Sequence, residues 1–329
     1  MKKRTSLLLA LPIFLILAGL ALSLGPRSVS FDELWNALVA ADTSRPEDVV
    51  VWSLRIPRLV AALLCGASLG VAGSIMQTVT RNPLADPGLL GINSGAAFGV
   101  VVFMAVAGDE VTVARSAAAM AGATSGALVV LTLGAFAGSR PHPLRLLLAG
   151  AAVSAFFLAM VRAFLLLSQQ ALDAYRFWVM GGLDGISMAA IGTLLPLFTT
   201  GLVLAAAAGL MLNAYVLGED LAKSLGVDIH LAYLLGLGAA VCLCAAVVTL
   251  AGPIGFVGLI APHLAKVLAG TDERVRLLVS ALLGAAVLLT ADIAGRLLFA
   301  GAGMQAGVMV ALIGAPALLL AIRRGRVDV

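Results

Sequence analysis

The sequence predicts an all-α integral membrane protein with about ten transmembrane helices. Of its 329 residues, 61% are hydrophobic and only 12% are charged, and the mean hydropathy is +1.09. An ordinary soluble domain carries about a quarter charged residues, so a water-soluble fold could not hide this much apolar surface. The apolar residues also come in nearly uncharged stretches, each about long enough to cross a bilayer core. We therefore expect residues 1–329 to form a single transmembrane domain.

Ten apolar stretches are the predicted spans. The first follows Met1-Lys2-Lys3-Arg4 and resembles a signal peptide, but it is longer than the apolar core of a cleaved signal, so we expect it to be retained. The eighth is too short to cross alone and needs a tilt or neighbouring re-entrant backbone. In chain order the spans are Thr5–Leu24, Pro57–Thr80, Gly91–Ala107, Val113–Gly138, Leu144–Leu167, Ala189–Leu212, Leu231–Ala251, Phe256–Ala269, Leu277–Leu298 and Ala306–Ile322.

The basic residues predict the orientation of these spans. With both termini cytoplasmic, thirteen of the 21 lysines and arginines fall in inner breaks, seven in outer breaks, and Arg162 inside a span. An inner excess of this kind is the usual orientation signal of membrane proteins. The net charge of +4 is thereby explained without nucleic acid as a partner.

Short features between and within the spans predict how the helices pack. We expect the longest polar break, Gly25–Arg55, to carry only one short helix, the amphipathic Phe31–Val39. The pairs Gly66/Gly70, Gly95/Gly99 and Gly122/Gly126 have the spacing that lets helix backbones approach closely. The three cysteines all lie in apolar stretches, so we expect neither disulfides nor a metal site.

Two motifs suggest enzymes but lack the context that each needs. Gly66–Gly70 fits the GxSxG nucleophile pattern, yet it lies in mid-span without the strand-to-helix turn or a histidine partner. Gly218–Ser224 resembles a phosphate loop, but Ala222 replaces the required glycine and two carboxylates would repel phosphates. We therefore expect no catalytic residues and no ATP hydrolysis by this chain.

Two helix breaks are harder to explain as ordinary loops. The first, Arg81–Gly91, contains two prolines that remove amide donors and a carboxylate beside the start of the next helix. The second, Gly252–His263, interrupts an apolar stretch at membrane depth, where other helices or a water-filled cavity must satisfy the backbone. Such breaks are typical of transporters. Their defining residues are Asn82, Pro83, Asp86, Pro87, Gly88, Gly252, Pro253, Gly255 and Pro262.

At these residues the chain resembles the FecCD family, the permease subunits of ABC importers for iron–siderophore complexes, haem and cobalamin. The resemblance covers essentially the whole length. It is most specific in Arg55-Ile56-Pro57-Arg58, in the Arg81–Gly91 break continuing through Ile92-Asn93-Ser94-Gly95-Ala96, and in Gly252–His263. One departure is Gly303-Met304-Gln305-Ala306, where the family commonly has an outer Glu-Leu-Pro segment, and it puts the detail of the outer docking surface in doubt.

The resemblance implies an ABC type II importer permease in the bacterial cytoplasmic membrane, surrounded by lipid. Such a subunit pairs with a second permease, which the siderophore systems suggest is a different chain. Two cytoplasmic ATPase subunits would bind ATP and magnesium, and a periplasmic or lipid-anchored binding protein would deliver the cargo. The sequence Gly91-Ile92-Asn93-Ser94-Gly95 favours a ferric siderophore as the cargo, with haem and cobalamin as alternatives.

The resemblance also assigns roles to particular residues. Coupling to the ATPase falls on Gly218, Glu219, Asp220, Leu221, Lys223, Ser224, Leu225, Gly226, Val227 and Asp228, whose mixture of polar points and apolar side chains suits a groove on a soluble partner. Docking of the binding protein falls on Arg55, Arg58 and Arg296. The fifth span would line the translocation path, and Ser154, Ala155, Leu158 and Arg162 are its candidate residues.

Arg162 is the most unusual of these charges, because a cation at mid-depth in a span costs roughly 2.5 to 3.5 kcal/mol. It lies near the outer end of its span and could simply snorkel to water. Our hypothesis is that it faces an outer cavity and attracts an anionic ferric complex. A competing class is an ion-coupled secondary transporter, but the spans lack central carboxylates apart from Asp292, which lies near an outer end.

Overall fold

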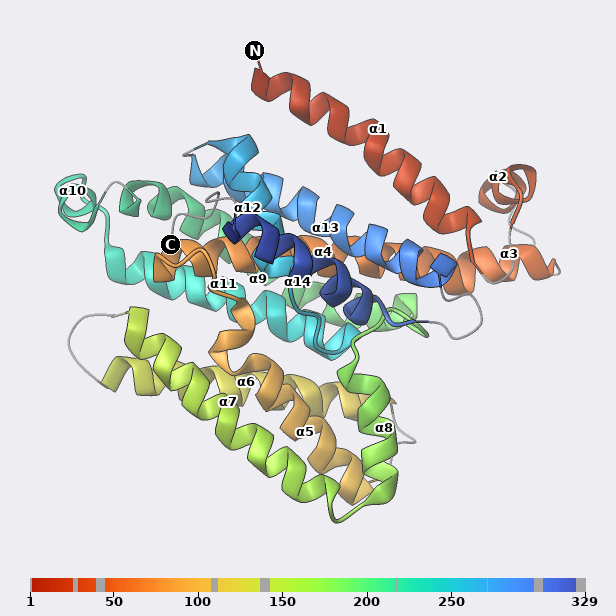
Figure 1. Cartoon of the computed structure of the whole chain (residues 1–329), viewed down its shortest axis with the longest axis horizontal. Helices are drawn as coiled ribbons and strands as arrows, with labels where there is room; N and C mark the ends of the chain where they lie inside the picture. The colour runs from red at the N-terminus through yellow and green to blue at the C-terminus, as the bar shows by residue number, and fades with distance from the viewer. Residues whose placement is uncertain are drawn as a thin grey trace.

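The structure is a computed structural model that describes residues 2–25, 29–39, 45–107, 112–136, 143–216, 218–270, 272–298 and 304–323. All regular structure in these ranges is helical (Figure 1). Every predicted span coincides with a helix, which confirms the expected fold class. These helices are α1 (Lys2–Ser23), α4 (Ile56–Thr80), α5 (Ile92–Ala107), α6 (Thr112–Phe136), α7 (Pro143–Leu165), α9 (Met188–Tyr215), α11 (Ile229–Ala251), α12 (Val257–Ala269), α13 (Glu273–Leu298) and α14 (Ala306–Arg323).

Six of the described helical segments are long and apolar enough to cross a membrane by length and composition alone. The remaining predicted spans correspond to shorter apolar helices. The eighth, α12, has 13 residues, which at 1.5 Å per residue is about 20 Å and less than the bilayer core. It therefore needs the neighbouring break to complete its path, as the sequence predicts.

In the described ranges, four short α-helices, a π-helical segment and a short 3₁₀ helix occupy the breaks. The predicted amphipathic helix is α2 (Phe31–Val39). The expectation that it is the single helix of the Gly25–Arg55 break is wrong, because α3 (Pro46–Val50) and the π-helical η1 (Val51–Arg55) extend α4 outward. A proline in the first turn, followed by two acidic residues, is a strong helix start. The other two short α-helices are α8 (Gln169–Val179) and α10 (Glu219–Ser224).

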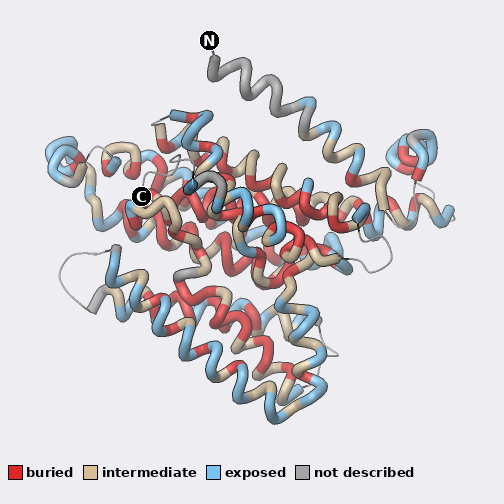
Figure 2. The backbone as a smooth tube through the Cα atoms, in the orientation of Figure 1, coloured by how far each residue is buried: buried red, intermediate tan, exposed pale blue. Residues whose placement is uncertain are grey.

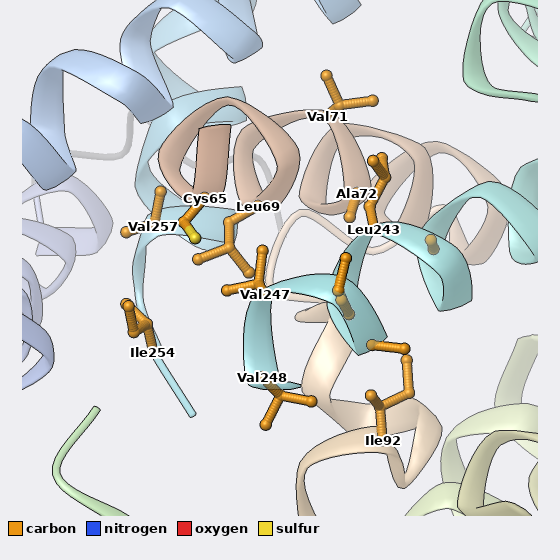
Figure 3. Close-up of a cluster of buried hydrophobic side chains, with 14 of the residues drawn as sticks. Cys65, Leu69, Val71, Ala72, Ile92, Leu243, Val247, Val248, Ile254 and Val257 are labelled. Carbon is orange, nitrogen blue, oxygen red and sulfur yellow. The ribbon is translucent and has the colours of Figure 1, made fainter. Parts of the chain in front are cut away.

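Helix α4 is the centre of the main helix group. It packs against α9, α11, α12 and α13, whereas α5, α6, α7 and α8 form a neighbouring group below it in Figure 1. Figure 2 shows α4 largely buried and α7 exposed along much of its length. In Figure 3, Leu69 of α4 points toward Val247 of α11, beside Ile254 and Val257 of the second break. The break thus lies against the core.

Glycines set the closest helix crossings, as the spacing predicts. A side chain on Gly66 or Gly70 of α4 would meet the backbone of α13 at Gly284 and Ser280. The α5–α6 crossing has the same design, because a Cβ on Gly95 would collide with the carbonyl of Gly122. These contacts confirm that the small-residue pairs are helix-packing positions.

Candidate functional sites

The predicted coupling segment, residues 218–228, projects at one end of the molecule as α10 and the turn after it (Figure 1). Gly218 has φ +114° and Gly226 has φ +75°, backbone conformations that favour glycine and that turn the chain into and out of the helix. Leu221 and Leu225 are 56% and 64% exposed, whereas Ala222 is fully buried against the protein. The segment therefore presents apolar side chains outward without a cover in this chain.

Polar residues of the same segment divide into two kinds. Asp220, Lys223 and Ser224 are exposed. Asp228 is also exposed, but its Oδ1 accepts hydrogen bonds from the backbone amides of His230 at 2.9 Å and Leu231 at 3.2 Å. Asp228 is therefore the N-cap of α11, and it has this structural role in addition to the predicted role in coupling to the ATPase.

The first break is held in place by its own polar side chains. Asn82 Oδ1 accepts the amide of Leu84 at 2.9 Å, and Asp86 Oδ1 accepts the amide of Gly88 at 2.7 Å. The second bond caps the short 3₁₀ helix η2 (Pro87–Leu90), as the predicted position of Asp86 requires. Each proline in the break lacks an amide donor. The side-chain oxygens of Asn82 and Asp86 each accept a backbone amide that has no helical partner.

The second break lies between α11 and α12. Gly252 has φ +72°, and Phe256 has φ +64°, an uncommon conformation for a residue with a side chain. The Ala251 carbonyl, left without a helical donor, accepts the amide of Gly182 at 2.8 Å. Other protein segments thus satisfy the backbone at this break, which is the condition for irregular backbone at membrane depth.

Pro262 is not a break residue, which corrects the sequence prediction. It lies inside α12, and the helix continues through it. A proline there removes the amide donor to the carbonyl four residues earlier, that of Gly258. The side-chain amide of Gln77 on α4 donates to that oxygen at 3.4 Å and to the Leu259 oxygen at 3.4 Å. A neighbouring helix therefore replaces the missing donor.

The three predicted docking arginines take part in bonds within the chain, at the end of the molecule that we predict to face outward. Arg58 donates from Nη2 to Asp292 Oδ1 at 2.7 Å and also pairs with Asp184. Arg296 pairs with Asp292 Oδ2 at 3.0 Å. The Asp292 side chain is 1% exposed, against 16% for Arg58 and 9% for Arg296. Docking of a binding protein at these residues stays a prediction.

Two of these arginines, Arg55 and Arg296, also complete the C-terminal end of α1. Arg296 Nη1 donates to the carbonyls of Ala21 and Leu24, both at 3.0 Å, and Arg55 donates to that of Leu22. The last carbonyls of a helix have no intrahelical donor and carry partial negative charge, so cations suit this position. Asp292 was recognised in the sequence only as a charge near an outer end, and Asp184 was missed, because neither shows a local motif.

A second buried charge cluster, also missed from the sequence, lies at the N-terminal end of α13. Glu273 is 2% exposed and pairs with Arg276 at 2.8 Å, while its Oε2 accepts the hydroxyl of Thr78 at 3.1 Å. Arg276 Nε donates to Ser74 Oγ at 3.1 Å. Nothing short of the three-dimensional packing of α4 on α13 indicates that these side chains meet.

The predicted path residues on α7 do not all share one environment. Ala155, Leu158 and Arg162 are exposed and, spaced by three and four residues, lie on one face. Ser154 instead bonds to Ser94 of α5 at 3.3 Å and is partly buried. It therefore contributes to packing between α5 and α7.

Arg162 lies close to α8. Burial raises the pKa of the Tyr175 hydroxyl, and the nearby Arg162 cation opposes that rise. Arg162 is exposed in the last turn of α7, a position from which its long side chain can reach water.

A bundle of long apolar helices interrupted by glycine and proline defines a multi-span membrane protein of the kind found among transporters. Comparison with known families is in accord: a model of the FecCD transport family matches residues 13–324, and the chain belongs to this family. The match covers nearly every described element, from α1 to α14.

Individual relatives extend this assignment. The chain is 39% identical to the ferric enterobactin transport system permease protein FepD of Escherichia coli, over 95% of this chain and 93% of that protein. It is 38% identical to the hemin transport system permease protein HmuU of Yersinia pestis, over 95% and 94%. A solved structure assigned to the metal-chelate type of ABC transporter, in an inward-facing conformation, aligns with a TM-score of 0.85 at 26% identity, covering 98% of this chain and 99% of that chain.

Proposed function

We propose that this chain is the membrane subunit that carries a ferric siderophore into a bacterial cell through the cytoplasmic membrane. The observation that carries the proposal is the coupling segment. Its short helix α10 and the turn after it present the exposed Leu221 and Leu225 at one end of the molecule. Such a helix fits a groove on a soluble partner. That partner would be a pair of ATPase subunits, which bind the ATP and magnesium.

The mechanism follows from where the segment is attached. ATP binding would draw the ATPase subunits together and move α10 with them. Two paired permeases would then tilt and expose the path to one side of the membrane and then to the other, which is alternating access. The energy source is in the partner subunits, and this chain would supply the conduit.

The cargo is the least constrained part of the proposal. The sequence of Gly91–Gly95 favours a siderophore, but the enterobactin and hemin relatives are almost equally similar to this chain. Overall similarity therefore does not separate the cargoes, and haem and cobalamin are the alternatives. A binding screen of the cognate binding protein against ferric enterobactin, hemin and cobalamin tests the choice, and saturable high affinity for hemin or cobalamin alone would contradict it.

The path would run along the exposed face of α7, with Arg162 near its outer mouth. A positive charge there would raise the local concentration of an anionic ferric complex and speed its entry. The second wall of the path would come from another permease. We propose a different but related chain, with both termini of this chain in the cytoplasm. Native mass spectrometry of the purified complex distinguishes a heterodimer from a homodimer.

A reconstitution experiment tests the coupling role. Leu221→Ala shortens a side chain that we expect the ATPase subunit to cover, and truncation of a central, fully covered interface contact costs about 1 to 2 kcal/mol, or roughly 5- to 30-fold in affinity. Leu38→Ala is the matched control, since Leu38 is 44% exposed on the short outer helix α2. We expect weaker ATPase retention and slower uptake in proteoliposomes with the first variant alone.

Two outcomes would contradict the proposal. One is a parent permease that retains no ATPase subunit. The other is uptake that persists when the ATPase is inactivated and that responds to an ion gradient, which would identify a secondary transporter instead.

A further inference from the structure

Two tyrosines at the base of the coupling segment form a buried hydrogen-bond chain. Tyr215 ends α9, three residues before Gly218, and Tyr233 lies in α11, five residues after Asp228. Their hydroxyl oxygens are 2.7 Å apart, and the Tyr233 hydroxyl donates to the carbonyl of Val79 at 2.9 Å. The two tyrosines are only 2% and 6% exposed.

The direction of the chain follows from proton count. A carbonyl can only accept, so the one hydroxyl proton of Tyr233 is used on Val79. The bond between the tyrosines must then be donated by Tyr215. The order is Tyr215 to Tyr233 to Val79, and removing the middle oxygen breaks both bonds.

The Val79 carbonyl needs this donor because of a proline. In a continuing helix its partner would be the amide four residues on, which is residue 83, and Pro83 has none. Val79 is fully buried, so water cannot readily replace the bond. A buried carbonyl left unpaired loses its hydration without any compensating bond. Tyr233 thus supplies the donor that the first break lacks.

A second contact joins the same elements. The guanidinium carbon of Arg81, the first residue of the break, lies 4.5 Å from the centre of the Tyr215 ring. Arg81 has φ +50°, an uncommon conformation for a residue with a side chain. The turn at the start of the break is therefore held on the tyrosine that ends α9.

We propose that Tyr215 and Tyr233 are positioning residues that transmit movement of the coupling segment to the Arg81–Gly91 break. They stand on either side of residues 218–228 and bond to the last turn of α4, so displacement of the segment pulls on the break through hydroxyl and ring contacts. The inference rests on the proposed function, since it assumes that α10 is moved by an ATPase.

Hydrogen–deuterium exchange on the assembled permease–ATPase complex tests this role. Exchange is measured in residues 218–228 and in residues 81–91, with and without a non-hydrolysable ATP analogue and magnesium. In the parent complex we expect the nucleotide to change exchange in both segments. In Tyr215→Phe the response of 218–228 should persist while that of 81–91 falls about fivefold, the equilibrium effect of one typical hydrogen bond.

The choice of variants protects the test from a trivial folding defect. Tyr215→Phe keeps the ring over which Arg81 lies and keeps the Tyr233–Val79 bond, so it should fold even where Tyr233→Phe does not. The double variant should match Tyr233→Phe, because that change already removes both bonds. Tyr175→Phe, a tyrosine of α8 on the other side of the membrane, is the matched control and should respond like the parent.

Each outcome decides the matter. An unchanged nucleotide response at 81–91 in Tyr215→Phe, or no response there in the parent, would overturn the transmission role alone. No response at 218–228 in the parent would overturn the proposed function, and this inference with it. A variant that is merely less stable, but still transmits the response to 81–91, would show that the tyrosines serve packing only.

Discussion

The ion network of Arg58, Arg296 and Asp292 offers the sharpest test of the structure, through the substitution Asp292→Asn. Asp292 is 1% exposed and shares its carboxylate between Arg58 on α4 and Arg296 on the same helix. The substitution keeps the size of the side chain but leaves two largely buried guanidinium groups without their shared anion. Breaking a buried ion pair in this way typically costs about 3 to 5 kcal/mol.

The measurement is the free energy of unfolding of the purified permease in mixed micelles, compared with the parent. Asp173→Asn is the matched control, because its partner Arg176 is three residues on and both side chains are more than half exposed. An exposed pair of this kind contributes about 0 to 1 kcal/mol. We expect a large loss for Asp292→Asn and almost none for Asp173→Asn.

The double variant Asp292→Asn, Arg296→Gln makes the test more specific. Removing one of the two unpaired cations should recover part of the lost stability, because the effects of substitutions within one network are not additive. Equal stability of Asp292→Asn and the parent, within about 1 kcal/mol, would refute the network as a stabilising element. The arginines would then be better explained by the predicted docking of a binding protein, and their effect should appear in its association rate.

Three further outcomes are expected. Gly73→Ala should lower the unfolding free energy by about 1 to 3 kcal/mol, because its Cβ would collide with the carbonyl oxygen of Gly258, whereas Gly192→Ala meets nothing within 4 Å and should be neutral or stabilising; equal effects would contradict the packing. Asp86→Ala should cost about 1 kcal/mol in the same assay, and Asp86→Asn much less, because asparagine keeps the capping oxygen. Arg162→Gln should slow uptake at low concentrations of ferric siderophore, and unchanged uptake would remove the path hypothesis.

The fold could be predicted from the sequence because membrane helices are specified locally. Each span needs its own run of apolar residues, and the lipid forces every backbone group in it to pair within the helix. The amphipathic helix Phe31–Val39 was found for a similar reason, through its periodicity. Helices α3 and η1 were missed because their apolar run, Val49–Trp52, is too short to indicate a helix; their start at Pro46 is visible only through the proline and the acids after it.

The contacts of the charged residues could not be predicted, because a charge shows no partner in the sequence. Arg58 was expected to point toward a binding protein, yet the structure pairs it with Asp292, 234 residues away. Glu273 was not singled out at all, and only the approach of α4 to α13 brings it to Thr78. The prolines are an intermediate case: the sequence shows which donors Pro83 and Pro262 remove, but the side chains that replace them come from helices distant in sequence.

These contacts also divide the molecule into parts held with different strength. Helices α4 and α13 are joined by glycine crossings in their middle and by buried charges at both ends, Arg58–Asp292 at one end and Thr78–Glu273 at the other. The base of the coupling segment is joined to α4 by neutral bonds, each contributing about 1 kcal/mol, in place of ion pairs that cost several to break. A displacement that enters through α10 should therefore rearrange the tyrosine contacts and the first break before it disturbs the α4–α13 pair.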